Sequence, residues 1–331
     1  MSCKKLIFKT TLIALSACIF IFLVGGCRLL TPEEPFKQGS ETGLPLPPEI
    51  AQGERKEPII SVYVAEEGKI EQMGIEEYLE GVVAGEMDPN WPLEALAAQA
   101  IVARTFTLQK IVESGGVPKR NAHASTDIEE FQAYNAGEIN DKVKKAVNMT
   151  RGKVVRHKNE FAKTWFHAYA GPRTALADEG LAYKENPPYI QIVESPGKNI
   201  VPSEEGQWHH SFTLDEVREA VREATGNDPG VIQNAEIKSK GPSGRATSIK
   251  INDQIMSAPE FRLALGSTEM RSTYLTDINI ENGCLNLSGE GYGHGVGLCQ
   301  WGARALAEQK KSPEEIINYF YKNINIVKLW D

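Results

Sequence analysis

The pattern of apolar and polar residues changes at Ile59, where short alternating runs and helical periods begin. These runs predict a strand at 59–64 and helices near 75–87 and 92–112. The two helices are separated by Asp88-Pro89-Asn90, a sequence typical of a turn. We therefore expect a compact domain from residue 59 to residue 331.

Two later segments predict antiparallel hairpins rather than βαβ units. Residues 153–168 would turn near Lys158-Asn159, and residues 235–251 at Gly241-Pro242-Ser243-Gly244. Three helix starts are marked by a hydroxyl residue placed three positions before a glutamate, at Thr213, Ser257 and Ser312. The pattern indicates an α+β fold of mixed helices and hairpins in one compact domain, with room for a smaller inserted lobe.

The first 27 residues carry the pattern of an export signal. Lysines at 4, 5 and 9 precede the uncharged stretch 10–24, which Gly25-Gly26-Cys27 follows. A signal-peptide core is shorter than the roughly 20 residues that span a bilayer, so length alone leaves a secretion signal and a membrane anchor open. Val24 to Cys27 resembles a lipobox, which implies lipidation of Cys27. Whether it is a lipoprotein or keeps an uncleaved transmembrane anchor, the chain is expected on the extracytoplasmic face, attached to the membrane through its N-terminus.

Residues 28–58 predict a flexible tether between this signal and the domain. The segment carries six prolines among Glu, Gly and Gln, and such a composition buries too little apolar surface to order itself. The three predicted parts are therefore a signal or anchor at 1–27, a tether at 28–58 and a domain at 59–331.

Composition excludes one class of partner. The formal net charge of -8 and the absence of clustered Lys and Arg argue against a nucleic-acid-binding protein.

Of five cysteines, only Cys284 and Cys299 lie in the predicted domain. They could form a disulfide in an exported protein or be two buried small residues, and they show no metal-ligand spacing.

A carboxylate falls on the apolar face of the first predicted helix. Glu86 follows Ile75 by eleven positions, which places it within about 20° of that residue at 100° per residue. It therefore shares the apolar stripe formed by Ile75, Tyr78, Leu79, Val82 and Val83. Burial raises a carboxyl pKa toward neutrality, as a general acid needs. The alternative is a frayed helix end or a carboxylate neutralised by a structural partner.

An arginine takes the equivalent place on the second predicted helix. Arg104 lies in the centre of the stripe formed by Leu93, Leu96, Ala97, Ala100 and Ile101. Because a guanidinium cannot lose its charge there, it needs a partner: Glu86, another carboxylate, or a substrate oxygen. A direct pair would lower the pKa of Glu86, so an orienting or substrate-binding role is the favoured interpretation.

Near the C-terminus, the segment GYGHGVGLCQWGA alternates glycines with larger residues. Its backbone can approach a ligand closely while Tyr292 and His294 project. Gln300 and Trp301 suit a sugar site, because an amide bonds hydroxyls and an indole face packs on a pyranose ring. A structural hydrogen bond for His294 and a core position for Trp301 remain open.

Two sequence blocks carry a family resemblance. IEEYLEGVVAGEMDPNWPLEALAAQAIVARTF (75–106) resembles the opening motif of the stage II sporulation protein D family, the SpoIID/LytB domain, and GYGHGVGLCQWGARALA (291–307) resembles its C-terminal signature. Weaker similarity runs through FQAYNAG, AVNMTRGKVV, WFHAYAG and PPYIQIVESP.

The resemblance implies a peptidoglycan lytic transglycosylase that cleaves glycan strands stripped of stem peptides, in septal wall thinning during sporulation. Glu86 stands where the family has its catalytic Glu. One carboxyl can protonate the bond between N-acetylmuramic acid and N-acetylglucosamine and then deprotonate the muramyl 6-hydroxyl. Most glycoside hydrolases need a second carboxylate, and neither Asp88 nor Glu94 shares the stripe of Glu86.

The substrate-binding candidates are Gln99, Arg104, His167, Tyr292, His294, Gln300 and Trp301. Some relatives bind zinc through a Cys and His set, but this chain has Phe131 where a Cys is expected, so we expect neither metal nor cofactor. The alternative function is a non-catalytic wall-binding modifier that stimulates a cell-wall amidase, as the LytB branch of the family name suggests. A zinc-dependent hydrolase is the least favoured hypothesis.

Overall fold

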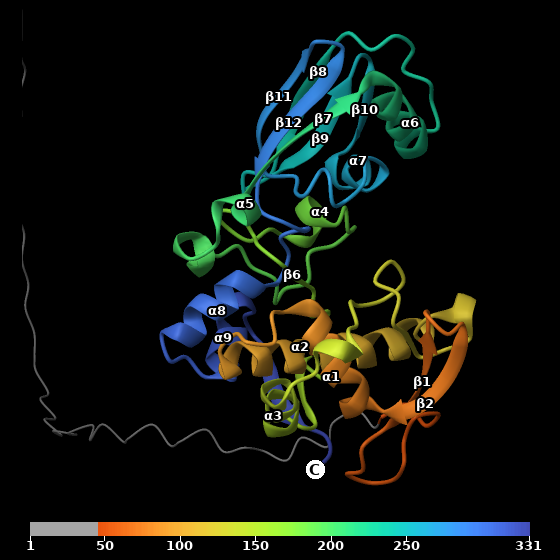
Figure 1. Cartoon of the computed structure of the whole chain (residues 1–331), viewed down its shortest axis with the longest axis vertical. Coiled ribbons are helices and arrows are strands. Elements are labelled where there is room, and N and C mark those ends of the chain that lie inside the picture. The colour runs from red at the N-terminus through yellow and green to blue at the C-terminus, as the bar shows by residue number, and fades with distance from the viewer. Residues whose placement is uncertain (1–45) are drawn as a thin grey trace, which may run out of the picture. The chain divides into compact units, whose positions relative to one another are not determined.

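The computed structural model describes residues 46–331, and their buried apolar side chains form two clusters. The larger cluster draws on residues before 191 and after 295, and the smaller one on residues 208–287. A lobe that runs from β7 to β12 is thus inserted into a larger body (Figure 1). Along the described residues, nine α-helices and several small, mostly antiparallel sheets confirm the α+β fold.

The N-terminal part of the larger body holds a three-stranded sheet with the order β2-β1-β3 and three helices. Strands β1 and β2 are antiparallel, whereas β3 runs parallel to β1. The elements are β1 (Ile59–Val64), β2 (Lys69–Gly74), α1 (Ile75–Glu86), α2 (Leu93–Ser114), η1 (Pro118–Arg120), β3 (Ala124–Ser125), η2 (Ala136–Glu138) and α3 (Asp141–Met149).

The rest of the larger body combines segments from before and after the lobe. Its sheets have the orders β14-β4-β5 and β13-β6, and the second is a parallel pair. The elements are β4 (Lys153–His157), β5 (Glu160–Phe161), β6 (Phe166–His167), α4 (Ala177–Gly180), η3 (Pro196–Asn199), α5 (Ser203–Gly206), β13 (Leu298–Cys299), α8 (Gln300–Glu308), α9 (Pro313–Phe320) and β14 (Asn325–Lys328).

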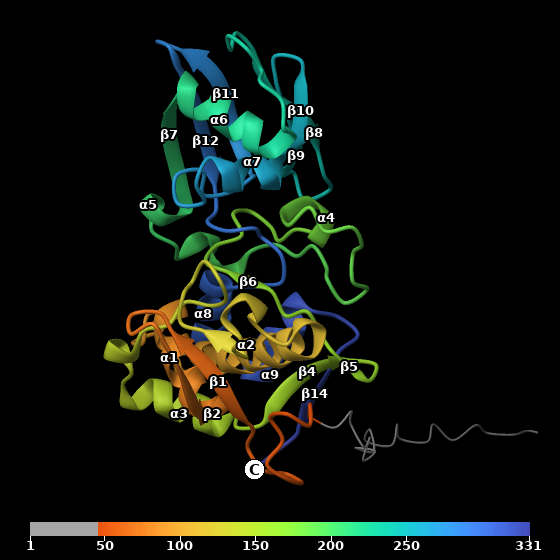
Figure 2. The ribbon, with the colours of Figure 1, turned by 90° about the vertical axis from the view of Figure 1, so that its right-hand side faces the viewer.

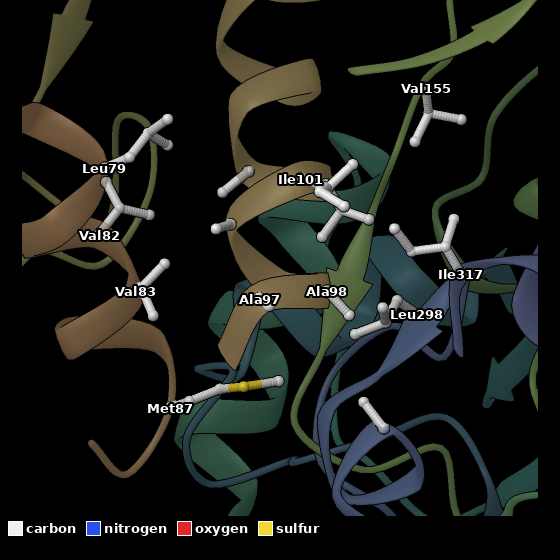
Figure 3. Packing of buried hydrophobic residues seen from close by; sticks show 14 of the residues in the cluster. Leu79, Val82, Val83, Met87, Ala97, Ala98, Ile101, Val155, Leu298 and Ile317 are labelled. Atoms are coloured by element: carbon white, nitrogen blue, oxygen red, sulfur yellow. The ribbon is translucent and has the colours of Figure 1, made fainter. Parts of the chain in front are cut away.

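The helix α2 is the centre of this body. It contacts α1, α3, α8, α9 and β4. The small residues Ala97 and Ala98 on α2 let these neighbours approach closely. Together with Ile101 they pack between the α1 side chains and those of β4, β13 and α9 (Figure 3). Burial of this apolar face, rather than helix propensity, stabilises so long a helix.

The inserted lobe contains two antiparallel three-stranded sheets, with the orders β11-β12-β7 and β10-β9-β8, and two helices. Helix α6 contacts both sheets, and α7 contacts β9 and β10. The helices cover one side of the sheets (Figure 2). The elements are β7 (Gln207–Thr213), α6 (Leu214–Thr225), β8 (Ala235–Lys240), β9 (Ala246–Ile251), β10 (Gln254–Ser257), α7 (Ala258–Ala264), β11 (Leu275–Glu281) and β12 (Cys284–Glu290).

Most elements lie where the hydrophobic pattern predicts them. Thr213, Ser257 and Ser312 each cap a helix by accepting a bond from the backbone N–H three residues on. The hairpin at 235–251 is confirmed, but the one predicted at 153–168 ends at Phe161. Phe166 and His167 pair with β13 instead, an interaction across more than 130 residues that no local pattern reveals.

Residues 46–58 contact the larger body. The Ile50 side chain is fully buried, and its carbonyl accepts a bond from Ile59 N. Glu57 accepts a bond from Glu76 N at the start of α1. Within residues 46–331, no helix combines the length and apolar character needed to cross a bilayer. The predicted signal segment and Cys27 lie outside the described residues.

Candidate active site

Two glycines on α1 shape the surroundings of Glu86. A Cβ at Gly81 would lie 2.2 Å from the Tyr134 ring, and one at Gly85 would lie 2.7 Å from Tyr134 N. Only glycine lets the segment around Tyr134 pack directly on the last turns of α1. This close packing brings the backbone N–H of Ala133 to the end of the helix, where Glu86 is the last residue.

The Glu86 carboxyl accepts hydrogen bonds from two distant segments. Ala133 N donates to Oε1 at 2.8 Å, and Gln300 Nε2 donates to Oε2 at 3.3 Å. Gln300 is the first residue of α8, which Cys299 caps by accepting a bond from Gly302 N. The carboxyl is thus held from both sides, while the side chain stays partly exposed.

Burial dominates the electrostatics of this carboxyl. It raises the pKa of Glu86 to about 7, from an ordinary value of 4.5, although the bonds from Ala133 and Gln300 act to lower it. Near neutral pH the group therefore exists in both protonation states. A carboxyl with such a pKa can donate a proton in one step and accept one in the next.

The glycine-rich segment forms a sequence of tight turns around His294. Its four glycines at 291, 293, 295 and 297 all have positive φ, between 75° and 106°. A Cβ at Gly295 would lie 2.4 Å from the guanidinium of the fully buried Arg245. His294 Nδ1 accepts a bond from Val296 N at 3.0 Å, which is the structural bond that the sequence left open. The ring remains partly exposed.

His167 lies against His294, with 5.4 Å between the ring centroids. Its Nδ1 contacts the carbonyl of Val296 at 3.2 Å, while Nε2 is buried without a partner among the described residues. Burial, together with the charges of Arg245 and Arg262, lowers the pKa of His294 to about 3. Burial also lowers the pKa of His167 well below its usual range. Both imidazoles are therefore neutral at physiological pH.

Arg104 does not lie beside Glu86. Its Nη2 is 2.5 Å from Oε2 of Glu76, and Nε lies 3.1 Å from Oε1. Glu76 also accepts bonds from Gly152 N and Trp330 Nε1. Since Glu76 and Glu86 are ten residues apart on α1, the pair lies about 15 Å along the helix from Glu86. The sequence left three partners open for Arg104, and the one found in the structure is a carboxylate other than Glu86. Arg104 is fully buried, so its role here is structural rather than substrate binding.

Of the other candidates, one is partly exposed and two are buried. Tyr292 is partly exposed and lies beneath Arg271, whose guanidinium carbon is 5.4 Å from the ring centroid. Trp301 is buried, and its Nε1 donates to Glu205 at 3.0 Å, so its indole occupies a core position beside the site. Gln99 is fully buried, and neither amide atom has a partner within residues 46–331.

Sequence reasoning missed the backbone donor Ala133, because nothing in its side chain identifies it. The glycines four apart in GVVAGE, at 81 and 85, are the signal that could have indicated a segment packed on α1. Cys284 and Cys299 carry free thiols. Across the described part of the chain, no group of three or more His, Cys, Asp or Glu side chains is arranged as metal ligands.

Two family models match separate regions of the chain. A family model described as Stage II sporulation protein matches residues 63–157, which include Glu86 and Ala133. A model described as a domain of unknown function matches residues 189–297, which include the inserted lobe. Gln300 lies beyond both matches.

Relatives extend the similarity over most of the chain. An uncharacterized protein of Brachyspira hyodysenteriae is 32% identical over 263 residues, which are 78% of this chain and 68% of that protein. Stage II sporulation protein D of Bacillus subtilis is 28% identical, over 81% of this chain and 78% of its own length. The amidase enhancer of Bacillus subtilis is 27% identical over 73% of this chain, but only 39% of the enhancer is covered.

The matched region at 63–157, together with the relatives, defines a SpoIID-type domain. The chain therefore belongs to the SpoIID family, whose members among its relatives are named Stage II sporulation protein D and amidase enhancer.

Proposed function

We propose that this chain is a membrane-attached lytic transglycosylase of the cell wall, with Glu86 as its general acid and base. Its substrate would be the glycan strands of peptidoglycan freed of stem peptides, and its setting the remodelling of the septal wall during sporulation. The observation that supports this most directly is the partly exposed Glu86 carboxyl, held by Ala133 and Gln300, with a pKa raised to about 7.

In the proposed reaction, the protonated Glu86 donates its proton to the oxygen between N-acetylmuramic acid and N-acetylglucosamine. The bond from this oxygen to the muramyl anomeric carbon breaks, and N-acetylglucosamine leaves with a free 4-hydroxyl. The Glu86 carboxylate then removes the proton of the muramyl 6-hydroxyl, whose oxygen bonds to the anomeric carbon. The product is a 1,6-anhydro-muramyl end, no water is consumed, and Glu86 recovers its proton.

The surroundings of Glu86 favour this single-carboxyl scheme. Most glycoside hydrolases need a second carboxylate that activates water or acts as the nucleophile. Both oxygens of Glu86 are contacted by neutral donors, an amide N–H and a glutamine side chain. His294 lies six residues before Gln300 and has a pKa lowered to about 3, so it would act as a neutral hydrogen-bonding group toward substrate rather than as an acid.

The test is mass spectrometry of the products formed from denuded glycan strands by the full-length protein in detergent. Wild type should yield anhydro-muramyl ends, and Glu86→Gln should yield none. Reducing ends would instead identify a hydrolase. A matched control is Glu80→Gln, which changes a partly exposed carboxylate on the same helix and should leave the product pattern unchanged.

The match to the amidase enhancer motivates a second candidate, a wall-binding modifier that stimulates an amidase. Such a protein would bind strands without cleaving them. Measured against a purified cell-wall amidase, stimulation that is equal for wild type and Glu86→Gln would support the modifier and count against the enzyme.

A further inference from the structure

The two residues that donate hydrogen bonds to Glu86 each lie within two positions of an aromatic side chain that belongs to a cluster. Ala133, which contacts Oε1, follows Phe131 by two residues, and Gln300, which contacts Oε2, directly precedes Trp301. We propose that these clusters are sugar-binding subsites on opposite sides of the bond that Glu86 protonates. A glycan strand would pass from one cluster to the other across the carboxyl. This inference rests on the proposed function of Glu86.

The first cluster, here the phenylalanine cluster, consists of Phe106, Phe131 and Phe166. Phe106 is in edge contact with both partners, with centroid distances of 5.4 Å to Phe131 and 6.2 Å to Phe166. The three rings come from α2, the segment before Ala133, and β6, and all three are partly exposed. Lys110 Nζ lies 5.9 Å from the Phe106 centroid and adds a donor at the edge of the cluster.

The second cluster, here the tryptophan cluster, consists of Trp91, Trp301 and Arg304. The indole centroids are 4.7 Å apart, and the guanidinium carbon of Arg304 lies 5.2 Å from Trp91 and 4.9 Å from Trp301. Trp301 is buried, whereas Trp91 is partly exposed and the Arg304 side chain is 31% exposed. Trp91 and Arg304 therefore form the part of the cluster that a ligand can reach.

The composition of both clusters suits a chain of amino sugars. A pyranose ring presents an apolar C–H face to an aromatic side chain and hydroxyl or N-acetyl groups to nearby donors. Each cluster combines partly exposed rings with one cationic donor, Lys110 or Arg304. The rings are held by their aromatic neighbours, so a ligand orders little on binding.

Partly exposed aromatic residues often only complete a core, and the chain contains a comparison for this. Trp165 and Tyr183 are 5.3 Å apart, with Lys163 Nζ 5.6 Å from the Tyr183 ring. This third cluster also combines aromatic rings with one cationic side chain, but Trp165 and Tyr183 are both distant in sequence from the two residues that donate to Glu86. The proposed subsites differ from this cluster because each contains a residue close in sequence to Ala133 or Gln300, the two donors to Glu86. Tyr183→Ala is therefore the matched control.

Binding is measured with the full-length protein in detergent that carries Glu86→Gln, so that strands are not cut. Calorimetry with denuded glycan strands of increasing length compares Trp91→Ala and Phe106→Ala with Tyr183→Ala. Each of the first two should weaken binding of long strands about tenfold, which corresponds to about 1.4 kcal/mol, and together they should weaken it multiplicatively. Strands too short to reach both clusters should respond to only one of the two variants.

Ring-preserving variants separate stacking from folding. Trp91→Phe and Phe106→Tyr should bind close to the parent if the rings contact sugar. If they lose as much affinity as the alanine variants, or if the alanine variants bind as tightly as Tyr183→Ala, the subsites are refuted. A loss at only one cluster would also overturn the two-sided arrangement.

The same variants in the protein with Glu86 intact separate this inference from the proposed function. Loss of a subsite should raise KM more than it lowers kcat. Anhydro products together with unaffected binding in the variants would leave the transglycosylase standing and refute the subsites. Binding through both clusters without any product would refute the transglycosylase and leave the subsites standing.

Discussion

The raised pKa of Glu86 makes this residue a source of instability above neutral pH, and replacing it should stabilise the protein there. The pKa is about 7 in the folded state against an ordinary 4.5, so the folded protein holds the proton more tightly than the unfolded chain. The favourable contribution of the protonated group is complete at low pH and is lost as pH rises through 7. Above that point the folded protein carries a charge in a poorly solvated place.

The size of the effect follows from the shift. Between pH 5 and pH 8.5, a carboxyl with pKa values of about 4.5 and 7 in the unfolded and folded states reduces the free energy of unfolding by about 2.5 kcal/mol. Glu86→Gln removes this dependence. The glutamine amide also turns an N–H toward Ala133 N or Gln300 Nε2, so one hydrogen bond is lost. This lowers the free energy of unfolding by roughly 1 kcal/mol, equally at both pH values.

The measurement is urea unfolding of wild type and Glu86→Gln at pH 5 and pH 8.5. Relative to wild type, the variant should gain about 2.5 kcal/mol more at pH 8.5 than at pH 5. Glu77→Gln serves as the control, because it changes an exposed carboxylate on the same helix. An equal difference between wild type and Glu86→Gln at the two pH values would refute the reasoning, because it would mean that Glu86 titrates alike in the folded and unfolded states.

Further predictions concern residues around the site and in the core. Arg104→Met should lower the free energy of unfolding by about 3–5 kcal/mol, because it leaves Glu76 charged and buried, and Arg104→Met with Glu76→Leu should recover much of that loss in urea unfolding. Cys299→Ala should cost about 1 kcal/mol through loss of the α8 cap, whereas Cys299→Ser should retain most of it. Gly85→Ala should displace the segment that contacts Glu86 and reduce product formation more than it lowers the melting temperature, as product analysis and calorimetry would show. The His294 ring signals should not titrate by NMR between pH 5 and pH 8, since its pKa is about 3.

The local part of this structure was predictable from sequence, and the long-range part was not. The stripe of α1 placed Glu86 on the buried face because helical periodicity is a property of neighbouring residues. The same reasoning found Arg104 in a buried position but not its partner Glu76. Glu76 is held by Gly152 and Trp330, and contacts across such distances leave no periodic signal.

The aromatic surroundings of Glu86 show the same limit. Trp301 was identified as a sugar-site candidate by residue type, yet its indole is buried with its N–H bonded to Glu205. The more exposed Trp91 lies directly after the turn that ends α1, and its contact with Trp301 brings together residues more than 200 positions apart. Residue type alone could not rank these two tryptophans, since their difference is one of burial.

The distance in sequence between Glu86 and Gln300 also has a consequence for how the protein matures. The two residues that meet at 3.3 Å are 214 positions apart, with the whole inserted lobe between them. A chain that is synthesised from its N-terminus delivers Glu86 long before Gln300. Until α8 docks against α2, the Glu86 carboxyl lacks the hydrogen bond that Gln300 Nε2 donates to Oε2. The surroundings of this carboxyl are therefore complete only when the segment that begins at Gln300 has joined the fold, after nearly all of the chain has been made.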